Sequence, residues 1–283
     1  MTKIIKLQFI PQLLFVFFFI LLLPYTSLAA SNSLEIHFID VGLGDCTLIK
    51  LPSGANILID TGSPASAPAV VQYLRSLRIE KIDHLILTHP HDDHIGGISG
   101  IADSFPTGKF YDNGTNNMHA IDEGYLAIVR SDTDRYEVLY AGESLVFDNI
   151  KFDILNPPSP PAGDPNNDSI VIRLRYNKFA LLLAGDIGFK GEKRILSLDV
   201  PLKSQVLKIA HHGENDSTSA EFLQRVGPEA AIITVSRINE YSRPHRQVLK
   251  RLHDGGAKIY RSDVNGNIIL RTDGNSFSVK TEK

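Results

Sequence analysis

Short runs of apolar and β-branched residues, separated by turn residues, dominate the chain after its first thirty residues. Such runs, bounded by Gly, Pro, Asn and Asp, are typical of buried strands. We therefore expect strands over residues 34–40, 47–51, 56–60, 83–88, 144–147, 151–155, 170–175, 178–184, 206–210 and 230–235, with others near 259, 268–270 and 277–279.

Helical periodicity occurs between these runs. In residues 67–77, Val70, Leu74 and Leu77 fall on one face of a helix. Similar spacing predicts helices over 121–130, 219–226 and 246–253. The strands form two sets, each followed by helices, and neither a repeat nor a linker divides them. The pattern predicts an α/β protein in which two sheets pack face to face with helices outside, as a single domain over residues 31–283.

The first thirty residues have a different pattern. Two lysines precede an uninterrupted apolar run over 13–23, Pro24 ends the run, and small residues follow it. This order is typical of an export signal, and the run is about half of the ~20 residues needed to span a membrane. We expect cleavage after Ala29 or Ala30 and a secreted, periplasmic or cell-surface protein without a stable membrane partner. An uncleaved signal would instead anchor the protein.

Composition is ordinary for a globular protein. The 283 residues are 43% hydrophobic and 22% charged, which excludes a disordered or collagen-like chain. The formal net charge of -3 conceals an uneven distribution. Residues 31–186 contain 11 Lys+Arg and 21 Asp+Glu, whereas residues 187–283 contain 16 and 11. Cys46 is the single cysteine of the sequence, so an internal disulfide is excluded.

The strongest chemical signal is the sequence T-H-P-H-D-D-H-I-G-G at residues 88–97. His89, His91, Asp93 and His94 all have side chains that bind divalent metals, and they follow a predicted buried strand. His89 and His91 are two residues apart and project to one side. Asp93 and His94 follow on a turn and can reach a second position. The spacing therefore predicts a metal site.

Three later elements could complete this site. Asp186 ends a predicted buried strand, where its carboxylate could bridge two cations. His211 and His212 follow another strand, and we expect one of them to be a ligand. Asp168 opens the strand that leads to Asp186, and there a polar turn remains as good an interpretation as a metal ligand.

The order H-x-H-x-D-H at 89–94, G-D at 185–186 and H-H-G at 211–213 resembles the metallo-β-lactamase superfamily, and within it the hydrolase domain of the ComEC competence proteins. Further motifs at 38–45, 58–62, 167–169, 217–219, 239–245 and 259–263 support the resemblance. It implies a four-layer αββα sandwich with a dinuclear metal site at one edge. Members of this superfamily hydrolyse lactams, thioesters, lactones and phosphodiesters, so the resemblance leaves the substrate open.

The resemblance also implies a division of ligands between two cations, Zn or Mn. We expect His89, His91 and Asp168 to hold one cation, Asp93, His94 and either His211 or His212 to hold the other, and Asp186 to bridge them. Many superfamily members have a further histidine before the bridging aspartate, and here Asn167 and Asp168 occupy that stretch. An oxygen ligand at this position would favour Mn.

Two cations about 3.5 to 4 Å apart would lower the pKa of a shared water and stabilise charge at the attacked centre. Asp93 and His245 are the candidate catalytic residues, the latter as a proton donor to the leaving group or as a phosphate ligand. Asp45, Asp60 and Asp92 are candidates for orienting the ligands.

The leading hypothesis is an exported phosphodiesterase or nuclease whose partner is a phosphoester or nucleic-acid substrate. A group of cations after residue 186 could guide a phosphate backbone: Lys203, Lys208, Arg237, Arg243 and Arg246. Alternatives are a hydrolase of phosphorylcholine or another cell-wall phosphoester, a β-lactam or lactone hydrolase, and a binding module that keeps the metal for stability. The oligomeric state is left open.

Overall fold

A computed structural model describes residues 33–115, 126–130 and 133–283. The predicted signal peptide at 1–30 lies outside the described residues, as does half of the predicted helix over 121–130. The described part of that helix, Leu126–Arg130, is a short π-helix. Among the described helices, none is long and apolar enough to cross a membrane.

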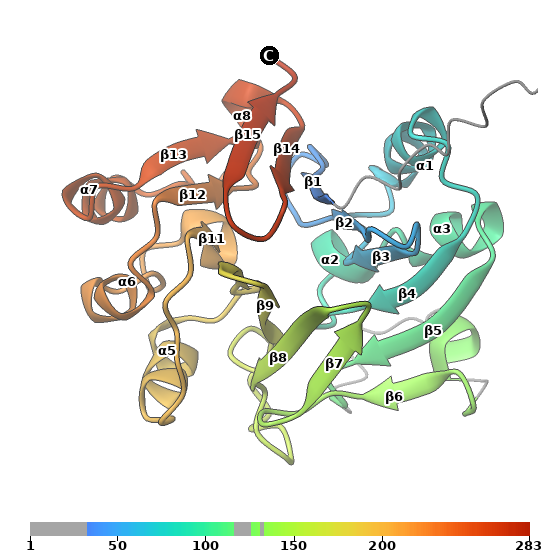
Figure 1. The fold of residues 1–283 in the computed structure, drawn as a ribbon, viewed down its shortest axis with the longest axis horizontal. Coiled ribbons are helices and arrows are strands. Elements are labelled where there is room, and N and C mark those ends of the chain that lie inside the picture. Colours follow the sequence, from blue (N-terminus) through green and yellow to red (C-terminus); the bar gives the residue numbers. More distant parts are fainter. Residues whose placement is uncertain (1–32, 116–125, 131–132) are drawn as a thin grey trace, which may run out of the picture. The chain divides into compact units, whose positions relative to one another are not determined.

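Eight strands form the first sheet, in the order β15–β14–β1–β2–β3–β4–β5–β6 (Figure 1). Neighbours from β3 to β6 run parallel, and the other neighbours run antiparallel. The strands are β1 (Leu34–Phe38), β2 (Thr47–Lys50), β3 (Asn56–Ile59), β4 (Ile82–Ile86), β5 (Thr107–Asp112), β6 (Tyr136–Val138), β14 (Ile268–Thr272) and β15 (Phe277–Thr281).

Seven strands form the second sheet, in the order β13–β12–β11–β10–β9–β8–β7. Neighbours from β10 to β13 run parallel, whereas β7 to β10 form an antiparallel series. The strands are β7 (Ser144–Phe147), β8 (Ile150–Asn156), β9 (Val171–Tyr176), β10 (Phe179–Leu183), β11 (Val206–Lys208), β12 (Ala230–Ile233) and β13 (Lys258–Arg261).

Helices cover the outer faces of both sheets: α1 and α3 lie beside the first sheet, and α5, α6 and α7 beside the second (Figure 1). Alternate strand residues explain this layering, because successive side chains point to opposite faces. Ile57 and Leu181 belong to the core between the sheets, whereas Leu58 and Leu182 pack with the helices. The helices are α1 (Ala67–Ser76), α2 (Asp92–Ile95), α3 (Ile98–Ser104), α5 (Phe189–Leu196), α6 (Ala220–Val226), α7 (Arg246–Asp254) and α8 (Ser262–Asn265). The predicted αββα sandwich is confirmed.

The parallel strands determine where the functional side chains gather. Chain segments that leave the carboxyl ends of neighbouring parallel strands emerge at the same edge of a sheet. In the first sheet β4 leads into α2, and in the second β10 and β11 lead into a turn at Asp186 and into the 3₁₀ turn η2 (Ala210–Gly213). Gly185 has a φ of +52°, and a Cβ there would lie 2.7 Å from Cβ of Ser169. Glycine therefore allows the turn that presents Asp186.

Candidate metal centre

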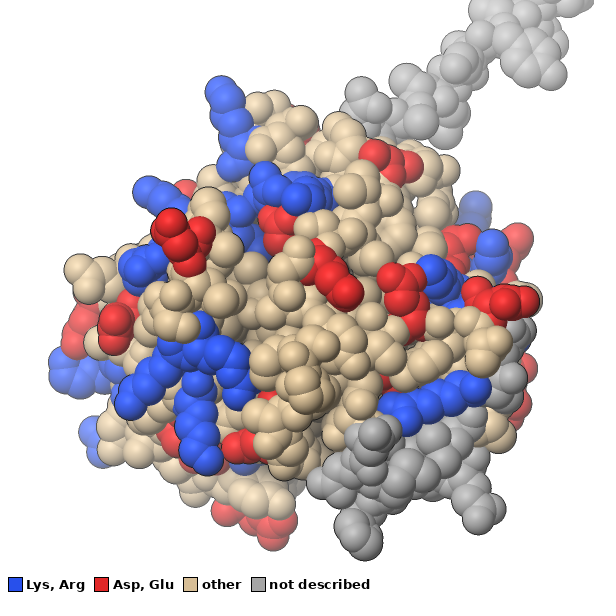
Figure 2. Space-filling model, turned by 90° about the horizontal axis from the view of Figure 1, so that it is seen from below, with Lys and Arg blue, Asp and Glu red and all other residues tan. Residues whose placement is uncertain are grey.

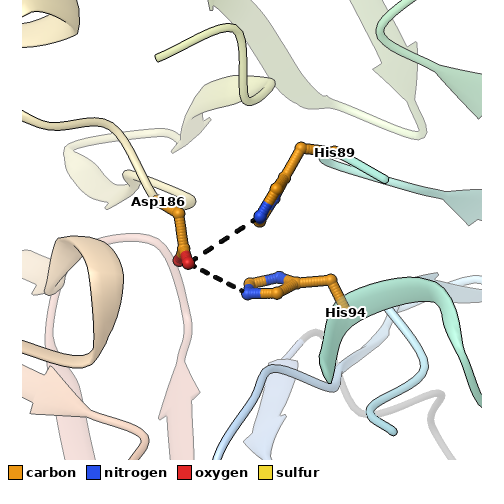
Figure 3. A group of neighbouring side chains, drawn as sticks. All are labelled: His89, His94 and Asp186. Atoms are coloured by element: carbon orange, nitrogen blue, oxygen red, sulfur yellow. Dashed lines mark ion pairs between the residues drawn. The ribbon is translucent and has the colours of Figure 1, made fainter. Parts of the chain in front are cut away.

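Five side chains from both sheets converge at this edge. His89 follows β4, and Asp93 and His94 belong to α2. Asp186 follows β10, and His212 lies in η2 after β11. Figure 3 shows the rings of His89 and His94 directed toward the carboxylate of Asp186. The structure thus brings together five of the eight residues predicted as metal ligands.

The distances place these side chains around two overlapping positions. Oδ2 of Asp186 lies 3.3 Å from Nε2 of His94, 3.6 Å from Nε2 of His212 and 3.8 Å from Nε2 of His89. Oδ2 of Asp93 lies 3.4 Å from Nε2 of His212 and 4.0 Å from Nε2 of His94. The triads His89–His94–Asp186 and Asp93–His94–His212 each hold their ligand atoms within 4.8 Å of one another. They share His94, so the two positions are adjacent.

The chemistry of these atoms fits divalent cations. Nε2 of His94, Nε2 of His212 and Oδ1 of Asp186 are buried and have no hydrogen-bond partner among the described residues. Leaving a buried polar atom without a partner costs about 1–3 kcal/mol, so such atoms in a native protein call for another ligand. Imidazole nitrogen and carboxylate oxygen are the ligands that zinc and other first-row metals prefer. Together with His89 and Asp93, these residues could hold the metal.

The electrostatics of the cluster also favour a cation. Burial lowers the pKa of His94, but the carboxylates of Asp186 and Asp60 together raise that pKa well above its usual value. Burial raises the pKa of Asp186, but His94 and His212 outweigh burial and hold that pKa well below its usual range. Burial and the neighbouring His94 keep the pKa of His89 well below its usual value. The carboxylate of Asp186 therefore stays ionised and attracts positive charge to the centre of the cluster.

Asp60 orients His94, as the sequence predicted. Nδ1 of His94 lies 2.8 Å from Oδ2 of Asp60. The backbone N–H and the hydroxyl of Thr88 donate to the same carboxylate at 2.8 and 2.7 Å. A hydrogen bond on one ring nitrogen fixes the orientation of the ring and leaves the other nitrogen for a metal. Asp92, by contrast, is exposed on α2.

His212 is held from the second sheet. Its Nδ1 donates to the carbonyl oxygen of Thr234 at 2.9 Å, so Nε2 faces the cluster. The hydroxyl of Thr234 donates to Asp45, whose Oδ2 lies 2.8 Å from Nζ of Lys208. The ammonium of Lys208 is buried and paired with Asp45, so the prediction that Lys208 guides a phosphate backbone is wrong.

His91 lies beside the cluster. Its Nδ1 is 3.1 Å from Nε2 of His89, and the side chain is only partly buried. Two imidazole nitrogens at this separation can face one cation together. The structure therefore brings His91 to the side of the cluster that His89 occupies.

Asp168 is not brought to the cluster. Its Oδ2 accepts hydrogen bonds from the backbone N–H groups of Gly163 and Asp164 at 2.7 and 3.1 Å, and its Oδ1 lies 3.3 Å from Nη1 of Arg194. The carboxylate closes its own loop and pairs with α5 rather than facing a metal. The structure therefore does not support Asp168 as an oxygen ligand. The preference for Mn depended on that ligand, so it is not supported either.

His211 and His245 lie at the rim. Nη2 of Arg243 donates to Nε2 of His211 at 2.9 Å, so that nitrogen already has a partner, whereas the corresponding atom of His212 faces the cluster. Of the two neighbouring histidines, His212 has the geometry of a ligand. Nε2 of His245 lies 2.9 Å from Oε1 of Glu214. His245 is thus held beside Arg243, outside the two triads.

Two residues that support the cluster, Glu214 and Thr234, were not predicted from the sequence. Glu214 contacts both Arg243 and His245, and Thr234 holds His212. The signal for Glu214 was its place directly after H-H-G, but its partners come about thirty residues later. Only the meeting of the two loops in space reveals this contact.

Comparison with known families agrees with this geometry. Residues 39–236 match the family described as the metallo-beta-lactamase superfamily. The chain therefore belongs to the metallo-β-lactamase superfamily, as its histidine and aspartate motifs predicted.

Two relatives are similar to this chain over most of its length. ComE operon protein 3 of Bacillus subtilis (strain 168) is 30% identical over 268 residues, which cover 89% of this chain and 34% of that protein. Recombination protein 2 of Haemophilus influenzae is 32% identical over 241 residues, covering 83% and 28%. The chain thus spans about a third of the length of these relatives. The metallo-beta-lactamase fold protein YhfI of Bacillus subtilis has a TM-score of 0.54 at 12% identity, over 85% of this chain and 99% of YhfI, and shares the fold.

Proposed function

We propose that this superfamily hydrolase is a metal-dependent phosphodiesterase acting on nucleic acid. The observation that carries the proposal is the arrangement of ligand atoms around Asp186. Asp93, His94 and His212 can hold one cation, and the neighbouring nitrogens of His89 and His91 can hold a second, with the Asp186 carboxylate beside both groups. Two divalent cations held there, Zn or Mn, would lower the pKa of water and stabilise charge on an attacked phosphorus. This proposal gives a role to every buried cluster atom that has no hydrogen-bond partner.

The chain's own residues hold the reacting geometry. Asp60 and the carbonyl of Thr234 fix the rings of His94 and His212, so that both Nε2 atoms point inward. Asp186 contributes one carboxylate oxygen near three imidazoles. A site whose ligands are fixed beforehand needs little reorganisation when substrate binds, which is a major source of catalytic power.

Charge and relatives support a nucleic-acid substrate. Figure 2 presents acidic and basic side chains interspersed, with lysines and arginines grouped toward the left, the side that α5, α6 and α7 occupy in Figure 1. Arg237 and Arg246 are exposed in the segment around α7 that carries the basic excess. Cations near a catalytic site can guide a phosphate backbone. One of the related proteins, Recombination protein 2 of Haemophilus influenzae, is named for recombination, which supports the same class of substrate.

The substrate is tested by comparing three compounds in the presence of Mn or Zn: bis-p-nitrophenyl phosphate, a single-stranded DNA oligonucleotide and nitrocefin. We expect turnover of the first two and little of nitrocefin. Asp93→Asn should lower turnover more than about 100-fold, because it removes a ligand. Asp92→Asn, an exposed neighbour on the same helix, is the matched control and should keep wild-type turnover. Hydrolysis of nitrocefin alone would contradict the proposal.

We also propose that the protein is exported. The apolar run after two lysines and the small residues up to Ala30 support cleavage there. The intact mass of protein recovered from the producing cells' exterior should correspond to a chain beginning at residue 30 or 31. Recovery of the uncleaved chain in the membrane fraction would support an anchor instead.

A further inference from the structure

Arg243 occupies a position at the rim of the metal centre that the ligand set does not explain. Its Nε donates to Oε2 of Glu214 at 2.8 Å, and its Nη2 donates to Nε2 of His211 at 2.9 Å. That same nitrogen of His211 lies 3.9 Å from Oδ2 of Asp186. The guanidinium is therefore separated by the His211 ring from the Asp186 carboxylate, which His89, His94 and His212 surround.

The guanidinium is also held firmly. Its side chain is 10% exposed and lies over the ring of Tyr241, 4.5 Å from the ring centroid. The amide of Asn239 bonds to both ends of the Arg243 backbone: Oδ1 accepts from its N–H at 2.8 Å, and Nδ2 donates to its carbonyl at 3.0 Å. Such fixed donors lose little entropy when they bind a ligand.

The loop of Arg243 packs directly against η2, where His212 lies. The backbone N–H of His245 donates to the carbonyl of Gly213 at 2.9 Å. A Cβ on Gly213 would lie 2.6 Å from Cβ of Pro244, so the close approach of the two loops needs a glycine. The position of Arg243 is thus tied to the position of the metal ligands.

One hydrogen-bonding edge of Arg243 remains available. Nε and Nη2 have partners, whereas Nη1 donates no hydrogen bond to any described residue. The residues on either side of Arg243 in sequence line a surface hollow of about 640 Å³, which Arg243 itself does not line: Ser242, Pro244, His245, Arg246, Gln247 and Lys250. Arginine is well suited to phosphate, because its planar fork offers parallel donors to two oxygens.

We propose that Arg243 is a catalytic residue that binds a non-bridging oxygen of the phosphodiester, with Glu214 as the residue that positions it. This inference rests on the proposed function and adds a specificity determinant to it. A phosphodiester has two non-bridging oxygens, so one can face the metals while the other faces Arg243. A lactone is neutral and has no anionic oxygen to offer Arg243.

The test compares Arg243→Lys and Arg243→Gln with Arg175→Gln. Arg175 is a suitable control because it is also paired through Nε with a carboxylate, Asp153 at 2.6 Å, but its side chain lies on the outer face of the second sheet. We expect Arg243→Lys to lower kcat for bis-p-nitrophenyl phosphate about 100-fold, a loss typical of removing one transition-state donor. Metal content should stay at the wild-type value, and Arg175→Gln should have no effect.

Glu214→Gln separates positioning from contact. It keeps the size of the side chain but weakens the bond to Arg243, so we expect a smaller fall in kcat, about 10-fold, with unchanged metal content. A loss of bound metal in Arg243→Lys would overturn the proposal, because it would mean that Arg243 only supports His211 and the metal centre. If the wild-type protein hydrolyses bis-p-nitrophenyl phosphate, equal turnover by Arg243→Gln would overturn the proposal as well.

A binding measurement keeps the inference distinct from the proposed function. After EDTA treatment, fluorescence anisotropy of a labelled oligothymidylate of twelve nucleotides reports phosphate recognition without turnover. We expect at least about 5-fold weaker binding by Arg243→Gln and wild-type binding by Arg175→Gln. If the wild-type protein hydrolyses no phosphodiester but shows this difference, the proposed function fails while the assignment of Arg243 to phosphate binding stands. Equal binding by the two variants would overturn that assignment.

Discussion

The two halves of the molecule contribute to the metal centre in different ways. The first sheet supplies His89, Asp93 and His94 from one short segment after β4. The second sheet supplies Asp186 and His212 singly, each after a different parallel strand. The first contribution is therefore contiguous in sequence, whereas the second is assembled by the order of strands β10 and β11.

Because of this difference, the ligands in the first half can be predicted from sequence motifs, whereas those in the second half can be assigned only from the fold. A contiguous cluster is recognised by composition alone. A single aspartate or histidine after a strand is ambiguous, as the pairs Asp168/Asp186 and His211/His212 demonstrate. In each pair one member has ligand atoms in the cluster and the other is bonded elsewhere. Variants of the two members of each pair should therefore differ in the amount of metal they bind.

The largest effect is expected for Asp186→Asn. The substitution removes the charge that three imidazoles face, at distances of 3.3 to 3.8 Å. We expect turnover to fall more than about 1,000-fold and bound metal to be lost, because the carboxylate stabilises both positions. Steady-state kinetics and metal analysis of the same preparation check this. Retention of both metals with wild-type turnover would remove Asp186 from the site.

A smaller but selective effect distinguishes the adjacent histidines. His212→Ala should reduce bound metal and lower turnover more than about 100-fold. The substitution removes a buried nitrogen that can bind the metal, Nε2, which lies 3.4 Å from Oδ2 of Asp93. His211→Ala should keep the full metal content, because Arg243 already occupies its Nε2. Metal content measured for the two variants side by side decides the assignment. The opposite pattern would make His211 the ligand.

Asp168→Asn is expected to act on stability rather than on metal binding. The carboxylate accepts two backbone hydrogen bonds and pairs with Arg194, and the amide cannot replace all of them. We expect the free energy of unfolding to fall by about 1–3 kcal/mol in guanidinium titrations. Metal content should match the wild-type protein. A selective loss of metal without a loss of stability would restore Asp168 as a ligand.

The smallest expected effect is on the pH dependence of stability, and it involves Glu192 in the second half of the molecule. Glu192 on α5 is buried and accepts hydrogen bonds from the backbone N–H groups of Thr218 and Ser219, before α6. Burial raises the pKa of Glu192 above its ordinary value of 4.5, against the hydrogen bonds from Ser219 and Thr218. Its contribution to stability is therefore complete below pH 4.5 and is lost as pH rises through the folded-state pKa.

Glu192→Gln should remove this pH dependence. The difference in the free energy of unfolding between wild type and variant should shift against the wild type as pH rises above 4.5. Urea titrations at several pH values measure the difference. A difference that is constant with pH would show that Glu192 does not titrate in this way.

Much of the fold could be predicted because most strands are apolar and β-branched. Strand β5 was missed, since Gly108 and Lys109 interrupt its apolar pattern. A Cβ on Gly108 would lie 2.4 Å from the carbonyl oxygen of Asp83, so the glycine serves close packing rather than a turn. Helix α5 was also not predicted, because Gly191 interrupts its helical pattern. Here too the glycine serves close packing, since a Cβ on Gly191 would lie 2.7 Å from Cβ of Ile187.

The site was predictable where chemistry and sequence proximity coincide. The segment from His89 to His94 and the strand-ending Asp186 were predicted as ligands from residue type and position alone, and the structure places His89, Asp93, His94 and Asp186 close together. The direction of the Asp168 carboxylate depends on Arg194, twenty-six residues later, and the availability of His211 depends on Arg243. These orientations are set by long-range hydrogen bonds, which the local pattern does not encode.

We propose that the two halves of the fold together hold two divalent cations, and that this arrangement defines the active centre. It is tested most directly by the metal-to-protein ratio of the purified protein, measured by mass spectrometry after dialysis and after titration with Zn or Mn. We expect about two tightly bound divalent ions per chain, as in a dinuclear hydrolase. Failure to retain any ion, with either metal supplied, would contradict it.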